Sequence, residues 1–186
     1  MSAATFSGAL EITLYNGSPL FNVAAVMSTD VDSTAILYDA GLVNREKIWN
    51  TIAWSDTKKQ MQYASPKEED TARNPEVKYR TVIGESNKGS LAIFPAPHQY
   101  FYPLDEAFNL KFTWYGNIYR NMMKGFGMGI RQKLEGDKRF VPWFNAPPWT
   151  EQRMNFFCLL STGKAAVALN GVKQFTHGDA YVPLPG

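Results

Sequence analysis

The stretch VKYRTVIGESNKGSLAIF, residues 77–94, decides the fold class of this 186-residue chain. In its first half, uncharged side chains alternate with basic ones, which is typical of a β-strand. One face of that strand holds Val77, Tyr79, Thr81 and Ile83, and the other holds Lys78 and Arg80. Asn87 and Gly89 then supply turn chemistry, and residues 90–94 return as a second apolar run. The stretch therefore predicts a β-hairpin.

Short strand patterns recur on both sides of this hairpin. Before it they cover residues 10–14, 21–27, 34–38 and 47–54, and after it residues 108–115, 127–132 and 139–144. Leu10, Ile12 and Leu14 alternate with polar residues, so the first strand is expected to be half-buried. It ends at a turn at residues 16–17, and residues 39–41 are read as the turn that closes the third strand.

Helical patterns are few. Residues 117–124 could form one or two helical turns, and residues 163–175 have apolar spacing typical of a C-terminal helix. Residues 55–75 are polar and predict a long surface excursion with at most a short helix. About nine strands without regular strand–helix alternation predict a mainly β protein. The expected architecture is an antiparallel β-sandwich with a short C-terminal helix, and a closed barrel is the alternative.

The length and the charge of the chain bear on its domain organisation and on its partners. The chain fits one domain over residues 1–186, and the tail at 182–186 stops without a closing element, as in a piece of a longer protein. The N-terminus lacks the basic and apolar regions of a signal peptide, and no apolar run of about 18 residues predicts a membrane span. These features leave the natural compartment and the oligomeric state open. A net charge of +2 without a basic block argues against a nucleic-acid partner.

Few residues offer metal or nucleophile chemistry. The single cysteine, Cys158, lies in an apolar run and is expected to be a buried hydrophobe. Only His98 and His177 are available as imidazoles, and Asp179 beside His177 is not enough for a metal site. The glycine-rich residues 125–129 precede a strand pattern, so they indicate a bulge or close backbone packing instead of a nucleotide loop. The sequence therefore predicts no metal and no cofactor.

The most unusual segment is residues 94–103, FPAPHQYFYP. Its three prolines exclude a regular inner strand and favour a stiff loop or edge. Such a loop would present His98, Gln99, Tyr100 and Tyr102, as an aromatic platform with hydrogen-bonding partners for a sugar ring. The structural alternative is that the aromatic rings plug one end of the sandwich.

A second aromatic segment covers residues 139–153. Trp143 and Trp149 flank a proline-stiffened loop, with Asn145 between them. Together with Arg131 on the preceding strand, they form the second half of the predicted ligand-binding set. The structural alternative is a packed loop with Trp143 buried.

Three functions from different classes remain open. The leading hypothesis is a binding or accessory domain for a carbohydrate-like or other small amphipathic ligand, carried by the two aromatic segments. The second is a hydrolase that uses His98 or a pair of carboxylates. The candidate carboxylates are Asp105, Glu106, Asp137 and Glu151. The third is a structural or oligomerising domain.

Four short stretches carry a resemblance to a known group of proteins. They are YRTVI at 79–83, FPAPHQYF at 94–101, FVPWFNAPP at 140–148 and THGD at 176–179. In these stretches the chain resembles the front part of larger, mostly uncharacterised bacterial proteins, in which a β-rich domain precedes a histidine-rich, hydrolase-like domain. The resemblance implies that this chain is the β-rich portion and that any metal-dependent site lies beyond Gly186.

Overall fold

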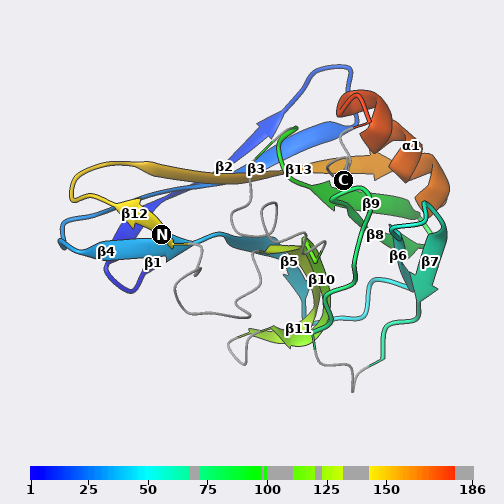
Figure 1. The fold of residues 1–186 in the computed structure, drawn as a ribbon, viewed down its shortest axis with the longest axis horizontal. Coiled ribbons are helices and arrows are strands. Elements are labelled where there is room, and N and C mark those ends of the chain that lie inside the picture. The colour runs from blue at the N-terminus through cyan, green and yellow to red at the C-terminus, as the bar shows by residue number, and fades with distance from the viewer. Residues whose placement is uncertain (68–71, 98, 100–110, 120–122, 132–142, 179–186) are drawn as a thin grey trace, which may run out of the picture.

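Thirteen strands and one helix form in the part of the chain that the computed structural model describes (Figure 1). That part comprises residues 1–67, 72–97, 99, 111–119, 123–131 and 143–178. Eight strands form one antiparallel sheet. In spatial order they are β1 (Ser2–Ala3), β2 (Phe6–Leu14), β3 (Leu20–Thr29), β13 (Gln152–Ser161), β9 (Gly89–Phe94), β8 (Val82–Ser86), β6 (Thr51–Ser55) and β7 (Met61–Ala64).

The other strands form two smaller antiparallel sheets. One has the order β10 (Thr113–Tyr119), β11 (Met123–Arg131) and β5 (Asp39–Asn44). The other pairs β12 (Trp143–Ala146) with β4 (Thr34–Leu37). Helix α1 (Ala165–Phe175) follows β13 near the C-terminal end.

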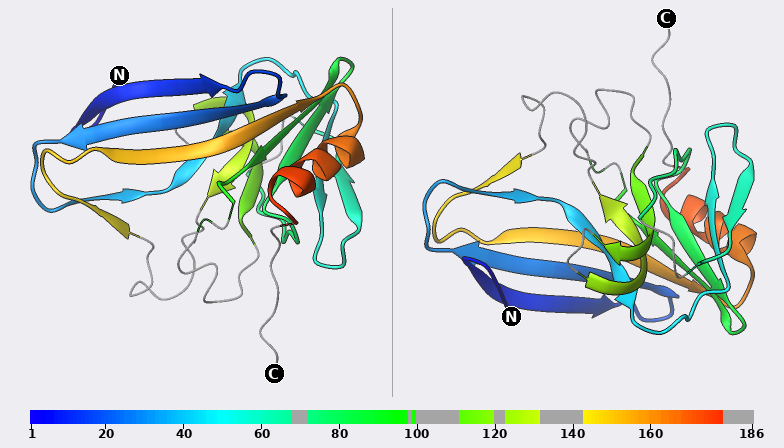
Figure 2. Two further views of the ribbon diagram at one scale, coloured as in Figure 1. Left: turned by 90° about the horizontal axis from the view of Figure 1, so that it is seen from above. Right: turned by 90° about the horizontal axis from the view of Figure 1, so that it is seen from below.

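Two apolar cores lie on opposite faces of the eight-stranded sheet. On one face α1 buries Ala168 and Leu169 against Ile83, Ala92 and Leu159 of the sheet. The core on the other face joins strands of the large sheet to β5, β10 and β11. Its buried residues include Ile52, Val82, Ile93, Cys158, Tyr115, Phe126, Met128 and Ile130. The molecule is thus layered, with the helix, the large sheet and the three-stranded sheet in turn (Figure 2).

The predicted fold class is confirmed. The chain is mainly β, its sheets are antiparallel and sandwich-like, and a short helix closes the described part. Among the described strands the large sheet keeps two separate edges, at β1 and at β7, so it does not close into the barrel that was the alternative. The hairpin of residues 82–94 forms as β8 and β9, with Ser86 paired to Gly89 at the turn.

Strand β13 is the element that the sequence pattern did not reveal. It lies between β3 and β9 and is central to the sheet. Its residues 156–160 face two cores at once, because Phe156 and Cys158 lie in one core and Leu159 lies in the other. A strand buried on both faces reads as a continuous apolar run and shows no alternation.

Several local predictions are wrong. Residues 39–41 are strand, not a turn, and β10 and β11 occupy the described ends of the expected helix at 117–124. β7 lies inside the stretch expected to be a surface excursion. The strand predicted from residue 77 begins only at Val82, because a tight turn in which the Thr81 N–H donates to the Tyr79 carbonyl interrupts it.

The glycine-rich stretch packs closely against its neighbours, as expected. A Cβ on Gly127 or on Gly129 would lie 2.7 Å or 2.8 Å from the indole of Trp114. A Cβ on Gly41, in the next strand, would also lie 2.8 Å from that ring. The three glycines therefore leave room for one buried tryptophan on β10, which explains why residues 39–41 are strand despite their turn-like composition.

Candidate functional site

Residues 143–153, the described part of the second aromatic segment, lie at one end of the molecule, where β4 and β12 run beside the extended ends of β3 and β13 (Figure 1). Trp143 and Asn145 are two positions apart on β12, so they point to the same face. Trp143 is 59% exposed, and Asn145 is exposed as well. Ala146, on the opposite face, is buried. The alternative of a buried Trp143 is therefore wrong.

Trp149 lies in the loop between β12 and β13, at the tip of this end. Its side chain is 81% exposed, and its backbone has a φ of 64°. The Thr150 N–H donates to the carbonyl of Pro147 at 3.2 Å, which closes a four-residue turn. With Pro148 in the second position and a positive φ in the third, this is the pattern of a type II turn. The third position of a type II turn favours glycine, yet here it holds a tryptophan.

Two further hydrogen bonds hold the tip in place. The Trp149 N–H donates to the carbonyl of Thr29 at 2.8 Å, which ties the turn to the end of β3. The Thr150 hydroxyl donates to the carbonyl of Pro147 at 2.5 Å. These hydrogen bonds therefore fix the backbone that carries the exposed indole of Trp149. We call Trp143, Asn145 and Trp149 together the ribbon–tip surface.

Arg131 ends β11 and is paired in register with Asp39. Trp143 is paired with Leu37, only two positions earlier on the same run of chain. Arg131 and Trp143 are thus paired with Asp39 and Leu37, which lie two positions apart where β4 continues into β5. The Nε of Arg131 is buried and has no hydrogen-bond partner among the described residues.

Tyr38 lies between these two pairings and is buried. Its hydroxyl donates to the carbonyl of Asn155 at 2.5 Å, which fixes the β4–β5 junction to β13. Burial, and to a smaller extent the charge of Asp39, raise the pKa of Tyr38 well above its usual range. Tyr38 is therefore a neutral structural donor at every physiological pH.

The first aromatic segment is described only in part. Gln99 uses its side chain locally, because its Oε1 accepts the N–H of Ala96 at 3.3 Å. Its carbonyl accepts a hydrogen bond from the guanidinium of Arg80. His98, Tyr100 and Tyr102 lie outside the described residues, so the aromatic platform predicted there stays a prediction.

Among the described residues, little supports the hydrolase hypothesis. Asp105, Glu106 and Asp137 lie outside the described part, and Glu151 is an exposed residue beside the tip. Within the described ranges, no three His, Cys, Asp or Glu side chains gather as metal ligands would. Cys158 is fully buried, as predicted, and burial raises the pKa of its thiol to about 12.

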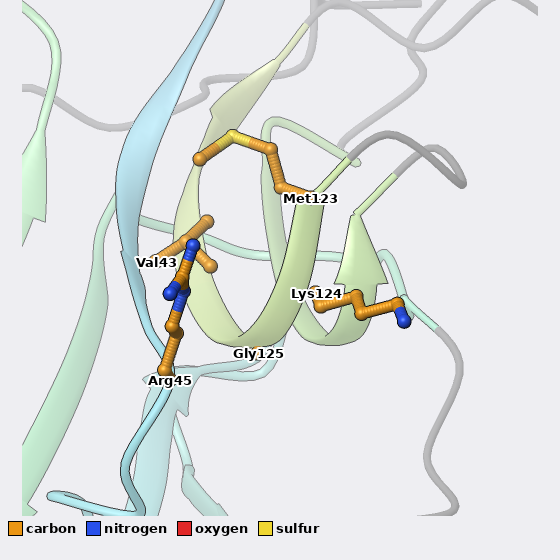
Figure 3. A pocket seen from close by; sticks show the side chains of 5 residues that line it. All are labelled: Val43, Arg45, Met123, Lys124 and Gly125. Atoms are coloured by element: carbon orange, nitrogen blue, oxygen red, sulfur yellow. The ribbon is translucent and has the colours of Figure 1, made fainter.

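One hollow was not expected from the sequence. It has a volume of about 800 Å³ and lies where the end of β5 meets the start of β11 (Figure 3). The described residues that line it are Val43, Arg45, Met123, Lys124 and Gly125. Figure 3 shows that the side chains of Arg45 and Lys124 lie on different sides of the β11 ribbon and do not converge on one point. None of the described residues that line the hollow belongs to the predicted site.

Comparisons with known protein families, with curated proteins and with solved structures found no match to this chain. The resemblance to the front part of larger bacterial proteins therefore stays a hypothesis. Among the described helices, none is both long and apolar enough to cross a membrane.

Proposed function

We propose that this chain is a binding or accessory domain and that its ribbon–tip surface takes a carbohydrate-like, amphipathic ligand. The observation that carries the proposal is the state of Trp149. A bulky L-residue in the left-handed region costs about 1–2 kcal/mol, and an exposed indole offers no burial within the chain to offset that cost. Such strain is characteristic of sites that hold a side chain ready for a ligand.

The chemistry of Trp143 and Asn145, the other two residues of the ribbon–tip surface, supports a sugar more than an ionic ligand. Trp143 supplies a second flat apolar face, and Asn145 on the same side of β12 supplies an amide that both donates and accepts hydrogen bonds. The ribbon–tip surface itself contains no charged side chain. A ligand with apolar ring faces and hydroxyl edges matches this combination.

The test is a glycan array followed by calorimetric titration of the best oligosaccharide. We expect the wild type to bind and Trp149→Ala to raise the Kd about 30-fold or more, because an aromatic anchor at the centre of an interface contributes about 2 kcal/mol or more. Trp143→Ala should weaken binding as well. Tyr63→Ala is the matched control, since Tyr63 is also an exposed aromatic residue but lies on β7 at the far edge of the sheet.

Three outcomes discriminate among the functions. Binding that falls in both tryptophan variants and persists in the Tyr63 variant supports the proposal. The absence of any binding on the array, or equal binding by all variants, overturns it. Cleavage of the bound oligosaccharide during incubation would instead favour the hydrolase hypothesis.

A further inference from the structure

Strand β2 leaves one edge of the large sheet open. β1 covers only its beginning, through the pairs Ser2 with Ser7 and Ala3 with Phe6. Gly8 also exchanges hydrogen bonds with Met1 through its N–H and its carbonyl. From residue 9 onward, β2 pairs only with β3 among the described strands (Figure 2).

The same bonds show which backbone groups of β2 face outward. Successive residues of a strand direct their N–H and C=O to alternate sides. Since Gly8 directs both groups toward Met1, the groups of Leu10, Ile12 and Leu14 also face the open edge. The free edge ends at a turn in which the Ser18 N–H donates to the Tyr15 carbonyl. The open stretch is therefore residues 9–15, and Ile12 is its centre.

The same three residues carry the exposed apolar side chains. Leu10, Ile12 and Leu14 are 57%, 60% and 77% exposed. They are paired with Ala25, Val23 and Phe21 of β3, so they extend the inner face of the sandwich past its last covered strand. The sequence predicted this strand correctly but not its exposure, because an apolar row has the same alternation whether or not another layer covers it.

An exposed apolar edge of this kind is rare in proteins that stay monomeric. In natural proteins, charges, prolines or bulges usually keep edge strands from pairing with another chain. Residues 9–15 contain no proline and one charged residue, Glu11, which is already paired with Arg153 at 2.6 Å within the chain.

One register satisfies this edge completely with a second copy of the same strand. A two-fold axis at Ile12 places Ile12 opposite itself and Leu10 opposite Leu14, so that every outward N–H and C=O of the three residues meets a partner. Tyr15 then faces the small Ala9, and Glu11 faces Thr13. A two-fold axis at Glu11 would place two carboxylates directly opposite each other, which is unfavourable.

The available area is enough for a weak, reversible dimer. The exposed part of each Leu or Ile side chain can remove at most about 100 Å² from water. Six such side chains, with Tyr15 and the strand backbone from both copies, bring the total to at most about 1,000 Å², the lower limit of a specific interface. We propose that two copies of this chain associate through their β2 strands, antiparallel about Ile12, and join their eight-stranded sheets into one.

Sedimentation equilibrium of the full chain tests the association. We expect a reversible dimer for the wild type and a monomer for Ile12→Lys, with the dissociation constant raised about 100-fold or more. Val167→Lys is the matched control, because Val167 is equally exposed but lies on α1. Circular dichroism checks that both variants fold. A wild type that stays monomeric, or an Ile12→Lys variant that dimerises like the wild type, overturns the proposal.

Cross-linking tests the register. Two copies of Ile12→Cys would lie directly opposite each other, whereas two copies of Leu14→Cys would lie four residues apart along the strands, about 14 Å. A thiol cross-linker clearly shorter than that separation should therefore join Ile12→Cys much more efficiently than Leu14→Cys. The buried Cys158 leaves the wild type as the unreacted control. Preferential cross-linking of Leu14→Cys would contradict the proposed two-fold axis. The dimer does not depend on the ribbon–tip surface, so either proposal can fail without the other.

Discussion

At the scale of single residues, Trp149 is one of the positions where the backbone conformation disagrees with the preference of the residue that adopts it. Two prolines and a closing threonine define the turn, and those residues are readable in the sequence. The positive φ and the exposure of the indole are not readable, because they depend on the hydrogen bond from Trp149 to Thr29, 120 residues earlier in the chain. Sequence reasoning could therefore name Trp149 as a candidate site residue but could not show that its backbone is strained.

Replacing Trp149 by glycine should not destabilise the domain. Glycine removes the left-handed penalty of about 1–2 kcal/mol and adds an unfolded-state entropy cost of about 0.5–1 kcal/mol. We expect the free energy of unfolding to rise by about 0.5 kcal/mol in denaturant titrations. Trp149→Ala keeps the penalty and is the control. A marked loss of stability in Trp149→Gly would show that the indole packs against the protein.

The thiol of Cys158 should make stability fall with rising pH. The folded state keeps the proton up to about pH 12, whereas the unfolded thiol loses it near pH 9. Above pH 9, ionisation of the thiol therefore lowers the free energy of the unfolded state but not that of the folded state. Between pH 9 and pH 10 the wild type should lose about 1 kcal/mol more than Cys158→Ala. Equal pH slopes for the two proteins would contradict the burial of the thiol.

At the scale of elements, helix α1 depends on a residue from the sheet. Its N-cap residue, Lys164, makes no capping hydrogen bond with its side chain. Instead, the carboxylate of the buried Glu85, on β8, accepts the N–H of Ala165. The sequence predicted the helix from its apolar spacing, but no pattern could link its first turn to a residue 80 positions earlier.

Glu85→Ala should therefore loosen the helix on the sheet. Removing a capping acceptor costs about 0.5–2 kcal/mol, and the N–H groups of the first turn lose a favourable negative charge. Thermal unfolding followed at 222 nm should show the loss. Glu151→Ala, at an exposed loop carboxylate, is the control and should leave the transition unchanged.

The three-stranded sheet shows why turn-like residues can form a strand. A Cβ on Gly129 would lie 2.0 Å from the carbonyl oxygen of Ala40 and 2.8 Å from the Trp114 ring. Alanine at this position must therefore push the backbone of β5 away. We expect Gly129→Ala to cost about 3 kcal/mol or more, at the upper end for overpacking. Gly17→Ala, at a turn position with open space around it, should cost only its positive-φ penalty of about 1–2 kcal/mol.

At the scale of the whole molecule, the fold class followed from alternation and turn chemistry, and the arrangement of the strands did not. The hairpin of residues 82–94 and the C-terminal helix are local features, so their own residues predict them. The central place of β13 rests on pairings with residues 20–27 and 90–94, which are distant in sequence. The same limit applies to the candidate site, since Arg131 and Trp143 are paired with Asp39 and Leu37, which are distant from both in the sequence.

The layered fold leaves two surfaces without a partner in the chain, and each has its own chemistry. The ribbon–tip surface is aromatic and stands on strained, fixed backbone, whereas the β2 edge is aliphatic and offers unpaired backbone groups. Because the ribbon–tip surface lies on β12 and the β12–β13 loop and not on β2, a dimer through β2 would carry two ribbon–tip surfaces. Binding of a polymeric ligand would then gain from the presence of both sites.

Calorimetric titration of Trp149→Gly with the oligosaccharide that the wild type binds best is the most direct test of the proposed function. We expect the heat of binding to disappear or the Kd to rise about 30-fold or more, while the free energy of unfolding of the same sample does not fall. That pair of results would separate a side chain held for a ligand from one held for the fold. Wild-type affinity in Trp149→Gly would contradict the account.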